Sequence, residues 1–204
     1  MPTSSGLGTQ DVPSPRRGVS VMRTIAKVAA PLALLAAVAA GTAAFAASPQ
    51  PRTSVPGSAL EPFRVVASQF TVAGADPRYI PITDKALISC IADPAGTGAM
   101  GIHYLYPDAL IDGVIDPNQP EAIVYAPSPS GSLHLVALEY IVDKAAWDAS
   151  HSSPPELIPG HPFDLTGAPN RFDLEPFYSQ HIWVGHGNPL GNLSMWNPAV
   201  HCHS

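Results

Sequence analysis

One apolar stretch, residues 133–142 (LHLVALEYIV), constrains the fold more than any other part of the chain. Nine of its ten residues are uncharged, and eight of these are apolar or aromatic. Its length, its partly β-branched composition and the Pro/Ser/Gly-rich turn before it are typical of a buried β-strand. Glu139 lies near its middle, and a carboxylate is costly to bury unless it is protonated, paired or bound to a metal. The stretch therefore predicts both the centre of a sheet and a special environment for Glu139.

The N-terminal region has the pattern of a secretory signal peptide. Basic residues within 22–27 precede a 13-residue Ala/Leu/Val run over residues 28–40, and a small-x-small pattern ends at Ala46. This order predicts a cleavable signal within residues 1–46. The run is shorter than the roughly 20 apolar residues that span a bilayer, which disfavours the alternative of an uncleaved anchor. We expect a secreted or extracytoplasmic protein with no stable membrane anchor after cleavage.

The export route has one alternative. Arg16 and Arg17 could belong to a twin-arginine signal. The residues that follow them, Gly18-Val19-Ser20, lack the strongly apolar pair that such signals carry. The general secretory route is therefore favoured.

Residues 47–204 are predicted to form a linker and one domain. Their six basic and fifteen acidic residues give a net charge of −9 with histidine neutral. This charge argues against a nucleic-acid partner, which needs a basic surface, and is compatible with a metal ion or a small molecule. Residues 47–62 are rich in Pro and Ser and predict a linker. Residues 63–204 are long enough for a single domain with a hydrophobic core, whose oligomeric state the pattern does not specify.

The two cysteines, Cys90 and Cys202, both fall in the part expected to be exported. Outside the cytoplasm an even number of cysteines favours a disulfide, which here would attach the C-terminus to the domain. The alternative is that residues 201–203 (HCH) form a soft-metal tail for copper or zinc.

Short apolar runs separated by Pro and Gly predict an α+β fold. Its main part would be an antiparallel sheet of at least four strands, able to curl toward a barrel, with a few short helices. Residues 121–126 and 133–142, joined by Pro-Ser-Pro-Ser-Gly, predict a β-hairpin. Residues 156–170, interrupted by Pro and Gly, predict a loop. The other expected elements are strands at residues 102–106 and 177–184, a helix at 144–151, and either a helix or a strand at 63–72.

Residues 96–101 (GTGAMG) formally match the dinucleotide-binding pattern G-x-G-x-x-G. That site requires a helix after the glycines, whose N-terminus faces the phosphates. A strand-like run follows here instead, so we reject a nucleotide fold. The glycines are expected to permit a tight turn and a close approach between backbones.

Three expected strands each carry one residue of a metal-binding type: His103, Glu139 and His181. Each falls among apolar neighbours on its own face of the strand. If these faces converge, two imidazoles and one carboxylate meet, a set that suits Zn, Fe, Mn or Cu with open positions for a ligand. Two alternatives stay open. One is a His–Glu pair without metal, in which burial raises the pKa of Glu139 and makes it a catalytic general base. The other is an inert structural network.

Other motifs add little. G-x-S-x-G, H-E-x-x-H and C-x-x-C do not occur, so the common hydrolase, metalloprotease and redox signatures are missing. His161 and His186, in Gly/Pro-rich segments, are candidates for the rim of a pocket.

Six sequence blocks between Cys90 and Cys202 occur together: CIADP (90–94), GAMGIHY (98–104), PEAIVY (120–125), LEY (138–140), PNRF (169–172) and WNP (196–198). In this combination the chain resembles a family of exported bacterial proteins to which no activity is assigned. The resemblance implies export and a single domain, and implies nothing about mechanism. The residues themselves favour a secreted domain that binds a metal or a small ligand, with enzymatic activity left open. The alternative is an extracellular structural or interaction domain with an inert polar network.

Overall fold

The computed structural model describes residues 54–202 of the 204-residue chain. By compactness the chain divides into residues 1–46 and residues 47–204, and every element described below belongs to the second unit. The predicted signal peptide, its cleavage site and the start of the predicted linker lie outside the described residues.

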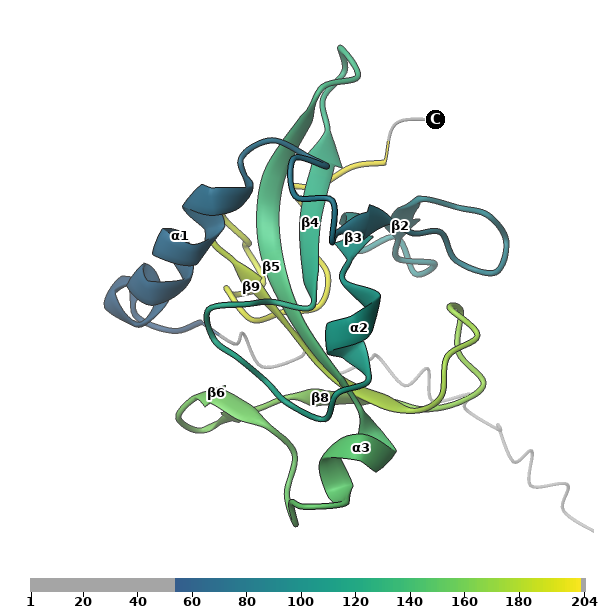
Figure 1. The fold of residues 1–204 in the computed structure, drawn as a ribbon. Coiled ribbons are helices and arrows are strands. Elements are labelled where there is room, and N and C mark those ends of the chain that lie inside the picture. Colours follow the sequence, from purple (N-terminus) through teal and green to yellow (C-terminus); the bar gives the residue numbers. More distant parts are fainter. Residues whose placement is uncertain (1–53, 203–204) are drawn as a thin grey trace, which may run out of the picture. The chain divides into compact units, whose positions relative to one another are not determined.

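Seven antiparallel strands form one open sheet, with three short α-helices around it (Figure 1). Six strands follow the order β1-β3-β4-β5-β9-β8, and β2 pairs with β3 beside this path. The predicted α+β class with an antiparallel sheet of at least four strands is confirmed, and the sheet does not close into a barrel. The strands are β1 (Ile80–Pro81), β2 (Cys90–Ala92), β3 (Ala99–Leu105), β4 (Ala122–Pro127), β5 (Leu133–Asp143), β8 (Asp164–Thr166) and β9 (Phe177–Trp183).

The predicted hairpin lies at the centre of the sheet. β4 and β5 pair antiparallel from Ala122 opposite Glu139 to Pro127 opposite Leu133. β9 pairs with the other side of β5, so this eleven-residue strand has a neighbour on both edges. A central strand covered on both faces needs apolar side chains in both directions. This explains why the sequence of β5 reads as a nearly continuous apolar run.

One face of the sheet packs against the N-terminal helices. Ile123, Leu138 and Ile182 point to this side and join the largest apolar cluster. The helix α1 (Glu61–Ala67) lies along this side of β5 and contributes Phe63 and Val66 (Figure 1).

Two smaller apolar clusters cover the opposite face. The Trp183 cluster contains Ala99, Val124, Ala126, Val136, Ala137, Trp183 and Val200, with Cys202 packed against it. The Phe177 cluster contains Leu105, Ala122, Ile141 and Phe177, with Ile82, Leu110, Phe172 and Leu174 packed against it. Along this face of β5 and β9, the residues between these two clusters are Glu139, Ser179 and His181.

Helical structure begins inside the predicted linker. η1 (Gly57–Leu60) leads directly into α1, and η2 (Ser68–Phe70) follows it. Val55 and Leu60 are buried in the core. Residues 55–62, which were predicted to be part of the linker, therefore contain the start of the helical segment and two apolar anchors among their prolines. Residues 63–72, which fitted a helix or a strand, are helical over most of their length.

One further prediction needs adjustment. Residues 156–170, predicted as a loop, contain β8 and a separate two-stranded pair, β6 (Glu156–Ile158) and β7 (His161–Pro162). These strands are two or three residues long, too short for alternation to show in the sequence. The other α-helices are α2 (Pro107–Leu110), after the predicted strand, and α3 (Lys144–Asp148), where a helix was predicted.

Two of the three glycines of residues 96–101, Gly98 and Gly101, permit close backbone contact, as predicted. A Cβ on Gly98 would lie 2.2 Å from the Asn197 carbonyl oxygen, and a Cβ on Gly101 would lie 2.5 Å from that of Tyr125. Both glycines have positive φ angles, of +147° and +119°. Gly98 lets the C-terminal segment form its bridge to Ala99, and Gly101 lets β3 approach β4.

We expect Gly101→Ala to lower the free energy of unfolding by about 2–4 kcal/mol, since it adds a backbone clash to an unfavourable φ angle. Urea unfolding measures this change. Gly57→Ala is the matched control, because a Cβ there meets nothing within 4 Å. Equal stabilities of the two variants would contradict the close approach.

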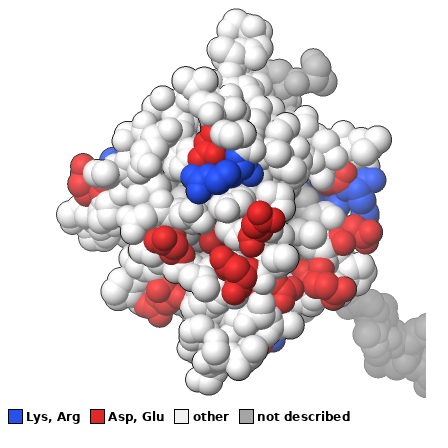
Figure 2. Space-filling view, viewed as in Figure 1, with Lys and Arg blue, Asp and Glu red and all other residues white. Residues whose placement is uncertain are grey.

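Within residues 54–202, no helix is both long enough and apolar enough to cross a membrane. On the face seen in Figure 2, acidic side chains outnumber basic ones, in keeping with the composition.

Candidate functional site

The strand register places His103, Glu139 and His181 on one face of the sheet. Glu139 on β5 is directly opposite His181 on β9. His103 lies on β3, opposite Val124 of β4. Ala122 of β4 is opposite Glu139 and shares this face. Since directly opposed residues point to the same side of a sheet, all three candidate ligands face the same way.

His103 and Glu139 meet across β4, which lies between their strands. Neighbouring strands are about 4.8 Å apart, so β3 and β5 are separated by about 10 Å. On this intervening strand Val124 is level with His103 and Ala122 is level with Glu139; both are fully buried, and Ala122 carries only a methyl group. The small side chain leaves the space in which the imidazole of His103 and the carboxylate of Glu139 approach each other.

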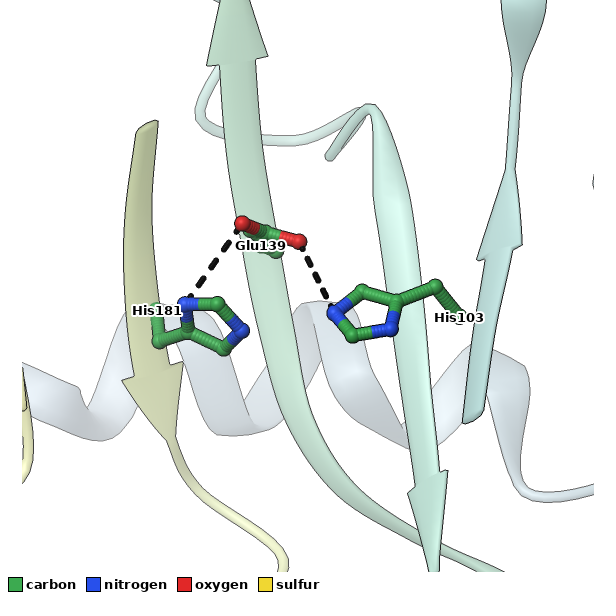
Figure 3. A group of neighbouring side chains, drawn as sticks. All are labelled: His103, Glu139 and His181. Carbon is green, nitrogen blue, oxygen red and sulfur yellow. Dashed lines mark ion pairs between the residues drawn. The ribbon is translucent and has the colours of Figure 1, made fainter. Parts of the chain in front are cut away.

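The three side chains form a compact cluster, which Figure 3 shows with Glu139 between the two imidazoles. Nε2 of His103 is 3.2 Å from Oε2 of Glu139, and Nδ1 of His181 is 3.5 Å from Oε1. The two imidazole rings are 5.7 Å apart and nearly perpendicular, at 89°. One possible ligand atom from each residue lies within 4.8 Å of the other two. The convergence that the strand pattern suggested is therefore present.

The cluster is buried, yet most of its nitrogens lack hydrogen-bond partners. His103, Glu139 and His181 are 3%, 5% and 2% exposed. Among the described residues, neither nitrogen of His103 nor Nε2 of His181 has a partner in hydrogen-bond geometry. Buried polar atoms are nearly always satisfied, so unpartnered nitrogens beside a carboxylate call for an explanation.

The protonation states suit metal ligands. Burial lowers the pKa of His181 to about 4, although Glu139 acts in the opposite direction. Burial alone would raise the pKa of the Glu139 carboxyl, but His181, His103 and Ser179 outweigh it, and the pKa lies below its ordinary value. His181 is therefore neutral and Glu139 is ionised at neutral pH. Burial thus acts on the pKa of Glu139 in the expected direction, but the net shift is downward, and the role of Glu139 as a general base stays a prediction.

A small apolar pocket adjoins the His103 and Glu139 side of the cluster. Its volume is about 30 Å³. Eight aliphatic or aromatic side chains, all of which belong to the Phe177 cluster or pack against it, form the rest of its wall: Ile82, Leu105, Leu110, Ala122, Ile141, Phe172, Leu174 and Phe177. His103 and Glu139 thus face a small space whose other walls are apolar.

The segment of residues 170–174 covers this pocket. Phe172 packs edge-on against His103, with ring centroids 6.4 Å apart. Arg171 donates to Oδ2 of the buried Asp84 at 2.9 Å and to the carbonyl oxygen of Ala92 at 3.1 Å. The Arg171 guanidinium and backbone hydrogen bonds hold the pKa of Asp84 below its usual value. An ion pair between distant parts of the chain therefore fixes this segment.

The structure also places the two cysteines and the two histidines that were predicted to lie at the rim of a pocket. Cys90 and Cys202 form a disulfide, so the Cys202 thiolate is not available to the alternative soft-metal tail. His186 lines a second pocket of about 190 Å³ together with His134 and His201, in agreement with its prediction as a rim residue. His161 lies in β7, away from both pockets.

Two features of the site were missed in the sequence. Glu121 is 1% exposed, and its Oε2 accepts a hydrogen bond from the Ile141 amide at 2.8 Å. Burial raises its pKa to about 8. A carboxylate immediately before the apolar run 122–126 was the available signal. The Asp84–Arg171 pair joins residues 87 positions apart and had no local signal.

Comparisons with known proteins give no relative. No family model matches the chain, and neither a curated protein nor a solved structure is significantly similar to it.

Proposed function

We propose that the protein binds a divalent transition metal ion, such as Zn, Fe, Mn or Cu, through His103, Glu139 and His181. The observation that carries this proposal is the convergence of three buried ligand-type side chains, in which three of the four imidazole nitrogens have no partner in hydrogen-bond geometry. Two neutral imidazoles and one carboxylate are a common ligand set for these ions. A metal held by three protein ligands keeps open positions, which both ligand-binding and catalytic centres use.

Charge and burial support the same proposal. Glu139 is ionised beside a neutral His181 in a dry environment, where a carboxylate is stabilised by a nearby counter-charge. A bound cation supplies that charge and accepts the lone pairs of the imidazoles. The small side chain of Ala122 would then allow His103 to approach Glu139. The direct pairing of Glu139 with His181 would bring the third ligand beside them.

The test is metal analysis of protein expressed from the full chain. We expect about one equivalent of metal after purification without chelator, or after stripping and reconstitution. Glu139→Gln and His103→Ala should each weaken binding at least 10-fold, because each removes a ligand. Metal at 100 times its Kd should stabilise the parent by about 3 kcal/mol, and this gain should vanish in Glu139→Gln.

Glu121→Gln is the matched control for this experiment. Glu121 is also a buried glutamate of the central hairpin region, but it bonds a backbone amide and is not one of the converging ligands. This variant should keep its metal. Absence of metal from the parent, combined with stabilisation by Glu139→Leu, would instead favour the inert polar network of a structural or interaction domain.

We also propose that the protein is exported and that its signal peptide is cleaved after Ala46. The disulfide supports this proposal, because such bonds persist outside the reducing cytoplasm. N-terminal sequencing of exported protein should give Ala47-Ser48 as the first residues. An intact N-terminus in the membrane fraction would contradict cleavage.

A further inference from the structure

The apolar pocket beside the cluster limits the molecules that can reach a bound metal. Its volume of about 30 Å³ exceeds the roughly 10–15 Å³ that one water-sized molecule needs. A ligand of one to three heavy atoms fits such a space.

The composition of the wall disfavours charged ligands. Apart from His103 and Glu139, every residue that lines the pocket is aliphatic or aromatic, and no Lys or Arg is among them. An anion entering it would lose its water, and only His103 and the proposed metal could offset that loss. Removal of even a neutral polar group from water without a new hydrogen bond costs roughly 2–7 kcal/mol.

The size of the pocket is held by several independent contacts. Oδ1 of Asn170 accepts hydrogen bonds from the amides of Phe172 and Leu174, at 3.1 and 3.3 Å. Arg171 is held by Asp84, and the Lys85 amide donates to the Arg171 carbonyl oxygen at 3.0 Å. The segment of residues 170–174 therefore presents Phe172 and Leu174 to the pocket from a fixed backbone.

We propose that the open positions of the metal receive a small uncharged diatomic molecule, such as a gas of the dioxygen class, and that Phe172 sets the size limit. This inference rests on the proposed metal site. It adds the class of ligand, which the pocket chemistry indicates, and a residue that selects it. Phe172 has this role because its ring contacts His103 and also forms part of the pocket wall.

The test uses metal-free protein reconstituted anaerobically with Fe(II) and three probes. Nitric oxide is small and uncharged, azide is small and anionic, and imidazole is neutral and larger. Absorption and electron paramagnetic resonance spectra report binding. We expect nitric oxide to change the spectra at micromolar concentration, and azide and imidazole to require at least 100-fold more.

Variants of Phe172 test the size limit. Phe172→Ala should tighten imidazole binding at least 10-fold and change nitric oxide binding less than 3-fold. Phe172→Leu keeps much of the side-chain volume and should give an intermediate result, which also serves if the alanine variant does not fold. Leu165→Ala, at an exposed residue of β8, is the control and should behave as the parent.

The outcomes separate the two proposals. Failure of the parent to bind Fe(II) or any other divalent metal overturns the proposed function, and this inference with it. Binding of Fe(II) with equal access for all three probes overturns only the pocket selectivity. Unchanged imidazole binding in both Phe172 variants overturns the role of Phe172.

Discussion

Replacement of Glu121 by Gln should make the protein markedly more stable at alkaline pH. Burial raises the pKa of Glu121 to about 8 in the folded state, against an ordinary value of 4.5. Between these two values the folded protein retains a proton that the unfolded chain has released. A rise in pH through this range therefore favours unfolding, by about 1.4 kcal/mol per pH unit.

Glu121→Gln removes the titrating carboxyl group and keeps the hydrogen bond with the Ile141 amide. The amide oxygen of Gln can still accept the hydrogen bond from the Ile141 amide, which Oε2 of Glu121 accepts in the parent at 2.8 Å. Between pH 5 and pH 9, we expect the stability of Glu121→Gln relative to the parent to rise by about 4 kcal/mol. Urea unfolding of the metal-free proteins at several pH values measures this difference.

Glu175→Gln is the control, because it removes an exposed carboxylate on the segment before β9. Its pH profile should follow that of the parent. Parallel profiles of Glu121→Gln and the parent would show that Glu121 is not protonated in the folded state at neutral pH, and would contradict the raised pKa.

The candidate site could be predicted because strand alternation carries most of its information. The run 133–142 identified a central strand, and period-2 alternation then placed Glu139 on the same face as Ala137 and Ile141. What alternation could not give was register. A slip of one residue in the pairing of β9 with β5 would turn His181 to the helix-covered face. The direct pairing of Glu139 with His181 is a property of the folded sheet.

The pocket could not be predicted, because its parts are distant in the sequence and lie in Pro/Gly-rich segments. Residues 170–174 carry no periodic pattern, and their position depends on Asn170 hydrogen bonds and on the pairing of Arg171 with Asp84. Ala122 also gave no signal in the sequence. It matters because a larger side chain at this position would fill the space between His103 and Glu139. Local composition predicts elements, whereas sites of this kind depend on contacts between elements.

Loss of the Cys90–Cys202 disulfide should be the most destabilising change outside the core. The bond joins β2 to the C-terminal segment across a sequence separation of 112 residues. Closure of a loop of this length reduces the entropy of the unfolded chain by an amount equivalent to about 5 kcal/mol in the chain-entropy description. We expect Cys90→Ser/Cys202→Ser to lower the free energy of unfolding by about 4–5 kcal/mol, measured by urea unfolding at constant pH.

The m-value distinguishes this mechanism from a loss of packing. An unfolded chain without the cross-link is less compact, so m should rise in the double variant. Cys202 packs only partly buried against the Trp183 cluster, and the Ala99–Asn197 bridge still holds the C-terminal segment nearby. The folded structure, and with it metal binding at His103, should therefore persist. A change below 1 kcal/mol with an unaltered m-value would mean that the unfolded chain gains little freedom when the bond is absent.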